Sequence, residues 1–172
     1  MKKGQKDIKD FKEVKTRKNS PRFYVLIACL IIVYGIGFIG SIFTSGETNT
    51  AWYESVKSSL TPPNWIFPVV WNILFFLIAL SMYFAWINSE KKQRLILIDL
   101  YGVNLIFNCL WSLLFFGLKD SFSAFVDIII IWLSIIVLMF YTRKISRTAS
   151  WLLLPYLIWV SFAALLNFLA IR

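Results

Sequence analysis

Five long apolar runs, separated by polar connectors, dominate the chain. Each run has about the length of a membrane-spanning helix, which uses roughly 20 apolar residues. Three connectors are short, which favours antiparallel neighbours, whereas the first connector, residues 44–64, is long enough to carry function. The pattern predicts an all-α integral membrane protein, a bundle of five transmembrane helices, with spans at residues 23–43, 65–87, 95–116, 122–141 and 151–171.

The composition supports this class. Of 172 residues, 59% are hydrophobic and 16% are charged, and the mean hydropathy is +0.70. A soluble domain of this length needs more polar surface to cover its core. Five spans take about 100 positions, so the chain divides into a basic tail, residues 1–22, and a transmembrane domain, residues 23–172. Pro21 is expected to end any tail helix before the first span.

Basic residues are unevenly distributed between the two sides of the predicted bundle. Of the 18 lysines and arginines, nine lie in the tail and three in each of the second and fourth connectors, all on one side. Only three lie on the opposite side. Because cytoplasmic loops are enriched in basic residues, we predict a multi-pass protein of the cell membrane with a cytoplasmic N-terminus. The tail fits a solvated segment or a short amphipathic helix that lies on anionic lipid.

The residue types present exclude several chemistries. The chain has no histidine, which removes histidine acid–base catalysis, imidazole zinc sites and histidine-ligated haem. Its two cysteines, Cys29 and Cys109, both lie inside apolar runs, as is typical of small buried side chains rather than of disulfides or metal clusters. The sequence therefore predicts no cofactor, no metal site, no catalytic residue and no nucleic-acid partner.

Polar residues inside the third span form a candidate site. Asn104, Asn108 and Trp111 lie at i, i+4 and i+7, on one helical face. Such asparagines either hydrogen-bond a neighbouring helix or, beside an indole, line a ligand pocket. Asp127 in the fourth span needs a hydrogen-bond partner, protonation or a nearby interface, since an unpaired acid there costs about 2.5–3.5 kcal/mol.

The second and fifth spans begin with proline and tryptophan. In the second span, Trp65, Trp71 and Asn72 are candidate ligand-binding residues at a helix start that a proline is expected to kink. Trp65 also fits an interfacial belt. In the fifth span, Trp159 and the small Ala163 share a face. The deeper tryptophans, Trp71 and Trp159, suit stacking on a flat apolar ligand.

These features occur in a specific order along the chain. The motifs are Trp52-Tyr53, Pro62-Pro63-Asn64-Trp65 with Pro68 and Trp71, Asn108 with Trp111 and Phe115-Phe116-Gly117, Val126-Asp127, and Leu154-Pro155-Tyr156-Leu157 with Trp159, Leu166 and Asn167. Together, from about Gly40 to Arg172, they resemble the tryptophan-rich sensory protein/translocator protein family (TspO/MBR, the peripheral-type benzodiazepine receptor family). The resemblance implies a five-helix bundle, commonly a homodimer, with a pocket closed by a lid loop, residues 44–64.

The resemblance also implies a ligand and its site. Ligands of such proteins are porphyrins, haem and sterols, although Phe168 stands where the sterol pattern of the last span expects tyrosine. The implied function is a membrane receptor or chaperone with a sensory or regulatory role in tetrapyrrole or stress handling. An enzyme that degrades porphyrin with light and oxygen, and a small-molecule transporter, are the alternatives. By position, the pocket residues would be Trp71, Asn108, Trp111, Trp159 and Ala163, with Trp52 in the lid loop.

Overall fold

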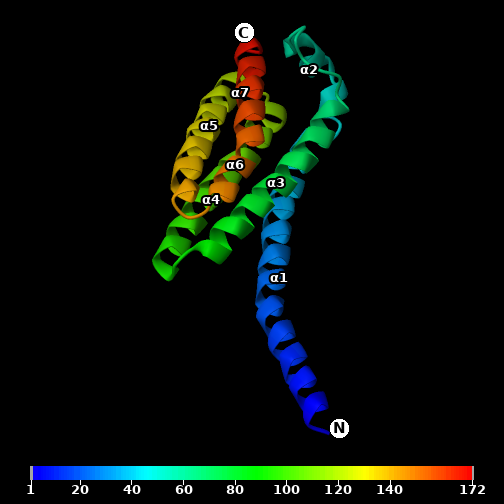
Figure 1. Ribbon diagram of the computed structural model, residues 1–172. Coiled ribbons are helices and arrows are strands. Elements are labelled where there is room, and N and C mark those ends of the chain that lie inside the picture. Colours follow the sequence, from blue (N-terminus) through cyan, green and yellow to red (C-terminus); the bar gives the residue numbers. More distant parts are fainter. Residues whose placement is uncertain (1, 172) are drawn as a thin grey trace.

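The protein is a bundle of helices (Figure 1), described by a computed structural model for the backbone of residues 2–171 and the side chains of residues 22–171. Within these residues there is no strand, and 5 segments are long and apolar enough to cross a membrane. The predicted five-span fold is therefore confirmed. The elements are α1 (Lys2–Thr44), η1 (Glu47–Asn49), α2 (Ala51–Val56), α3 (Ile66–Asn88), α4 (Lys91–Ser112), η2 (Leu113–Gly117), α5 (Ser121–Arg143), α6 (Arg147–Leu152) and α7 (Leu154–Leu169).

The helix starts differ from prediction for identifiable reasons. The third span begins at Lys91 rather than residue 95, because Glu90 and Gln93 form a capping box in which the Glu90 N–H donates to Gln93 Oε1 at 2.8 Å. The predicted kink at Pro68 is wrong. Since α3 begins only at Ile66, Pro68 lies in the first turn. The N–H groups of a first turn have no partner within the helix, so a proline there costs no helical hydrogen bond.

The prolines near the starts of the first and last spans behave differently. The prediction that Pro21 ends the tail helix is wrong, because α1 continues through it; a proline inside a helix removes one hydrogen bond without having to end it. The fifth span, by contrast, is interrupted at Leu153, between α6 and α7. Pro155 lies at the start of α7, a position that suits its fixed backbone angle.

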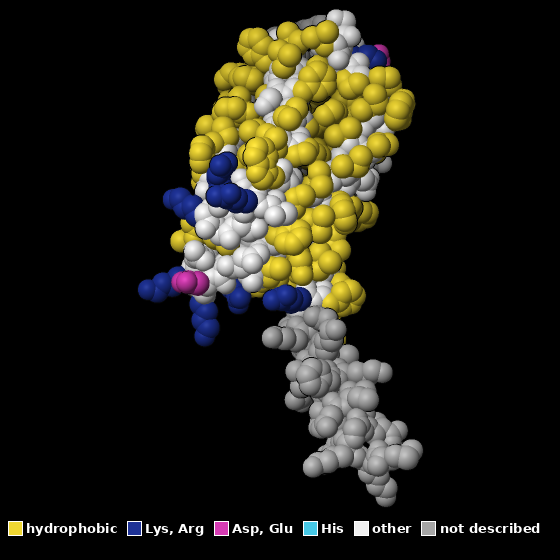
Figure 2. All heavy atoms as spheres, viewed as in Figure 1, with side chains coloured by type: hydrophobic (Ala, Val, Ile, Leu, Met, Phe, Trp, Pro, Cys, Tyr) yellow, Lys and Arg dark blue, Asp and Glu magenta, His cyan; other side chains and the backbone are white. Residues whose placement is uncertain are grey.

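The packing leaves an apolar outer surface around a continuous core. Helix α1 contacts α3 and α4, while α5 contacts α4, α6 and α7. Many large apolar side chains remain exposed on the outside of the bundle, and hydrophobic atoms cover most of the face shown in Figure 2. Such a surface is compatible with lipid as the surrounding solvent.

The two ends of the bundle differ in charge. Lys and Arg side chains gather toward the lower end of the described molecule in Figure 2, the end of the α3–α4 connector, whereas the upper end shows a basic side chain next to an acidic one. The lid loop and the C-terminus lie at this upper end (Figure 1). The lid loop is therefore at the end remote from the basic connectors.

Candidate functional site

A cavity of about 620 Å³ lies between the helices beneath the lid loop. Its walls come from α1, α3, α4, η2, α5 and α7, and residues of the lid loop line it as well. The structure thus brings together segments that are far apart in the sequence. The candidate residues that line the cavity are Trp71, Asn72, Asn108, Trp111, Trp159 and Ala163.

Ten aromatic residues line the cavity. The Trp71 ring lies 5.3 Å from that of Phe75, centre to centre, within α3. On α7, Trp159 meets Phe67 of α3 edge to face at 5.8 Å. Trp111 stacks on Phe115 at 5.1 Å with an interplanar angle of 12°. These contacts hold the rings in place, so the wall presents ordered aromatic surfaces to the cavity.

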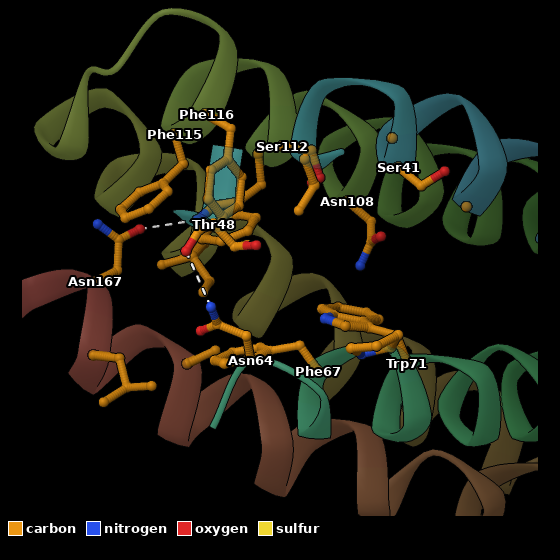
Figure 3. Close-up of a pocket in the computed structure, with 18 of the residues that line it drawn as sticks. Ser41, Thr48, Asn64, Phe67, Trp71, Asn108, Ser112, Phe115, Phe116 and Asn167 are labelled. Atoms are coloured by element: carbon orange, nitrogen blue, oxygen red, sulfur yellow. Dashed lines mark hydrogen bonds between the residues drawn. The ribbon is translucent and has the colours of Figure 1, made fainter. Parts of the chain in front are cut away.

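Amide groups interrupt this aromatic wall at defined points. Figure 3 shows Asn108 extending toward Trp71, and Asn108 Nδ2 donates to the Tyr156 hydroxyl at 2.9 Å. The Trp111 indole N–H donates to Asn167 Oδ1 at 2.9 Å. Each bond joins α4 to α7, so Asn108, Trp111 and Asn167 both link these helices and line the cavity.

Asn104 does not line the cavity, contrary to its selection as a ligand-binding residue. It is fully buried, donates from Nδ2 to the Ser134 hydroxyl at 2.7 Å, and accepts from the Tyr156 hydroxyl at 3.3 Å. The hydroxyl of Tyr156 thus lies between Asn104 and Asn108. Asn104 joins α4 to α5 and α7, which is the helix-packing alternative of the sequence analysis.

Two predicted tryptophans also lie outside the cavity lining. Trp65, at the start of α3, is 67% exposed, as the interfacial-belt alternative expects. Trp52 belongs to the lid loop but packs against the Phe115 ring at 5.4 Å instead of lining the cavity. The lid-loop residue that lines the cavity from α2 is its neighbour Tyr53.

The lid loop has its own internal structure. Gly46 has a φ of 83°, a left-handed conformation that glycine adopts readily, and turns the chain from α1 into η1. Thr50 caps α2 by accepting the Tyr53 N–H at 3.3 Å. Asn64 Nδ2 donates to the Thr48 carbonyl at 3.0 Å (Figure 3), which ties the two ends of the loop together.

Burial marks Tyr53 as the inward anchor of the lid loop. The side chain is 6% exposed, and its ring lies 5.8 Å from that of Phe116 on η2. Desolvation raises the pKa of the Tyr53 hydroxyl, and the adjacent charge of Glu54 acts in the same direction. Tyr53 therefore remains a neutral hydrogen-bonding group across the physiological pH range.

The contribution of α1 was missed by the sequence analysis. Tyr34, Gly37, Gly40 and Ser41 all line the cavity from this helix. The sequence does hold one signal, the small residues Gly37 and Ser41 one turn apart, but this spacing is also typical of close helix packing. Small residues permit close approach of any neighbour, so their spacing alone does not separate a helix contact from a cavity wall.

Asp127 is buried in the bundle outside the cavity lining, and it has no hydrogen-bond partner among the described residues. It is 3% exposed, and neither carboxyl oxygen has a hydrogen bond within the described part of the chain. Neither Lys119 nor Tyr101 is hydrogen-bonded to it: Lys119 pairs with Glu47 and Tyr101 with Ser81. The carboxyl group is thus an uncompensated polar group in the bundle.

Sequence comparisons relate the chain to known membrane proteins. The sequence model of the TspO/MBR family matches residues 28–172. The tryptophan-rich protein TspO of Archaeoglobus fulgidus is 42% identical over 147 residues, which are 83% of this chain and 92% of that protein. Protein CrtK of Rhodobacter capsulatus is 33% identical, over 85% of this chain and 86% of its own. The Homo sapiens translocator protein is 30% identical, over 76% and 79% respectively.

Proposed function

Because the chain belongs to the TspO/MBR family, we propose that this integral membrane protein is a receptor or chaperone for a planar hydrophobic ligand. One observation carries the proposal: the cavity beneath the lid loop is lined by Trp71, Trp111 and Trp159 together with the Asn108 amide. Ligand sites are typically concave and apolar, with a few well-placed polar groups. The proposed role is sensory or regulatory, in tetrapyrrole or stress handling.

A porphyrin or haem is the ligand that the cavity favours. Its volume of about 620 Å³ is in the range of small-molecule sites, roughly 300–1,000 Å³, and indole faces suit an extended ring system. Lys57, in the lid loop, is the one charged side chain among the described lining residues and suits the carboxylate edge of a porphyrin. A sterol is the second ligand class, and the tetrapyrrole is a ligand here rather than a cofactor.

The arrangement in the cell follows from the charge asymmetry. We infer that the basic connectors and the N-terminus face the cytoplasm, with the lid loop on the far side of the cell membrane. The basic tail then contacts anionic lipid. A homodimer is the assembly proposed for the bundle, by analogy with the family resemblance.

Replacing a cavity tryptophan should weaken porphyrin binding while replacing an outward one should not. Trp71→Phe and Trp159→Phe each shrink an aromatic face, so we expect the dissociation constant for protoporphyrin to rise about three- to tenfold. The measurement is quenching of intrinsic tryptophan fluorescence, titrated in the dark with detergent-solubilised protein.

The matched control is Trp65→Phe, because Trp65 is exposed and does not line the cavity. It should bind like wild type. If wild type shows no saturable quenching, or if all three variants match wild type, the proposed site is wrong. A porphyrin spectrum that changes in light and oxygen with wild type but not with Trp71→Phe would favour the enzyme alternative instead.

A further inference from the structure

The turn between η2 and α5 is held rigidly at both ends. The Asp120 N–H donates to the Leu114 carbonyl at 3.0 Å. The Asp120 carboxylate accepts the Ser123 N–H at 3.0 Å and the Ser123 hydroxyl at 2.6 Å, which caps α5. These hydrogen bonds, led by that of the Ser123 hydroxyl, lower the pKa of Asp120. The ionised cap fixes the backbone immediately after Lys119.

Lys119 has a backbone conformation that side chains disfavour. Its φ is 56°, and it is the one residue other than glycine with a positive φ among those described. Glycine adopts this left-handed region without steric cost, whereas a residue with a Cβ does not. Helices commonly end on a left-handed residue, usually glycine, and in this chain a lysine occupies that position after η2.

The Lys119 side chain reaches the lid loop. Its Nζ lies 3.5 Å from Glu47 Oε2 and 5.8 Å from the centre of the Trp52 ring. Glu47 belongs to η1 and Trp52 to α2, so one ammonium group contacts both helical pieces of the lid loop. Glu47 Oε2 is buried and has no hydrogen bond within the described residues. The ion pair with Lys119 therefore offsets the cost of burying this charged oxygen.

The lid loop packs against the part of the cavity wall that η2 forms. Trp52 packs on Phe115 and Tyr53 on Phe116, at ring distances of 5.4 and 5.8 Å. Both phenylalanines belong to η2 and line the cavity, and Figure 3 shows them side by side next to Thr48. The lid loop therefore packs directly on η2. Lys119 lies two residues after the end of η2.

We propose that Lys119 is a positioning residue that latches the lid loop closed through Glu47 and Trp52, and so sets how fast the cavity opens. The pair is partly exposed, with side-chain exposures of 44% and 31%, so the latch adds to the aromatic contacts without replacing them. The rate of lid opening is a property of the protein alone. Its effect on ligand exchange rests on the proposed function.

Hydrogen–deuterium exchange of the full chain in nanodiscs tests the latch without any ligand. Lys119→Gly removes the side chain and relieves the backbone, so it should leave the unfolding temperature unchanged or raised. It should nevertheless make amide exchange of residues 51–57 about three- to tenfold faster. Lys119→Gln should have a similar effect on exchange, and 1 M salt should accelerate exchange in wild type more than in Lys119→Gln.

The matched control uses the two glutamates of the lid loop. Glu47→Gln should accelerate exchange about two- to threefold. Glu54→Gln should not, because Glu54 pairs with Lys57 within the lid loop itself. Wild-type exchange in Lys119→Gly, or equal acceleration by Glu54→Gln and Glu47→Gln, would overturn the latch.

A second measurement separates the latch from the proposed function. Protoporphyrin should both enter and leave Lys119→Gln about three- to tenfold faster than wild type, with a smaller change in affinity. Unchanged rates with bound porphyrin would overturn the role of the latch in exchange. If porphyrin fails to bind wild type, the proposed function falls, whereas the exchange data on residues 51–57 still decide the latch.

Discussion

Gly37→Leu should abolish most porphyrin binding, by at least tenfold in dissociation constant, and destabilise the bundle by about 1–3 kcal/mol. A Cβ on Gly37 would overlap the Phe75 ring, with Phe75 Cζ at 2.7 Å. That ring is confined between Trp71 at 5.3 Å and Tyr34 at 6.0 Å. The Tyr34 hydroxyl in turn donates to the Asn72 carbonyl at 3.0 Å. The added side chain must therefore displace Phe75 and, with it, the Trp71 wall.

Gly35→Leu is the matched control on the same helix. A Cβ on Gly35 meets nothing within 4 Å, so we expect a change in stability within about 0.5 kcal/mol and unchanged binding. The measurements are thermal unfolding in detergent and fluorescence titration with protoporphyrin. Wild-type binding by a folded Gly37→Leu would show that the wall formed by Phe75 and Trp71 does not bound the ligand site.

Asp127→Leu should stabilise the protein, by about 1–3 kcal/mol in the free energy of unfolding. The carboxyl group is buried and both of its oxygens lack a hydrogen bond within the described residues. Leucine has a similar branched shape and is apolar, so it removes the cost of an unsatisfied polar group with little change in packing. Reversible unfolding in mixed micelles would measure the gain.

Asp99→Leu provides the comparison, because Asp99 is an exposed acid of α4 near the basic connector. It should stabilise the protein less than Asp127→Leu does, because an exposed acid near the start of α4 lies closer to the membrane edge than a buried one. A loss of stability in Asp127→Leu would mean that the carboxyl group has a partner in the native state, such as a bound molecule. The expectation that Asp127 is unpaired in the native protein would then be wrong.

The sequence predicted those parts of the cavity wall that depend only on the spacing of residues along one helix. Trp159 and Ala163 share a face because they are four residues apart on one helix, and Asn108 and Trp111 because they are three apart. All four line the cavity. Asn104 lies on the same face of α4 as Asn108 but does not line the cavity. The Tyr156 hydroxyl of α7 lies between the two asparagines, accepting from Asn108 and donating to Asn104. The periodicity of one helix cannot show where a side chain of another helix will lie.

Hydropathy and charge along the chain determined that the protein is a five-helix membrane bundle, because the bilayer fixes the length and polarity of every span. The order of its motifs determined the family. Only the tertiary structure decided that α1 forms part of the cavity, that Trp65 faces outward, and that Lys119 reaches Glu47 in the lid loop. Each of these depends on the rotation and approach of segments distant in sequence, which are set by packing of the whole bundle and leave no local periodic signal.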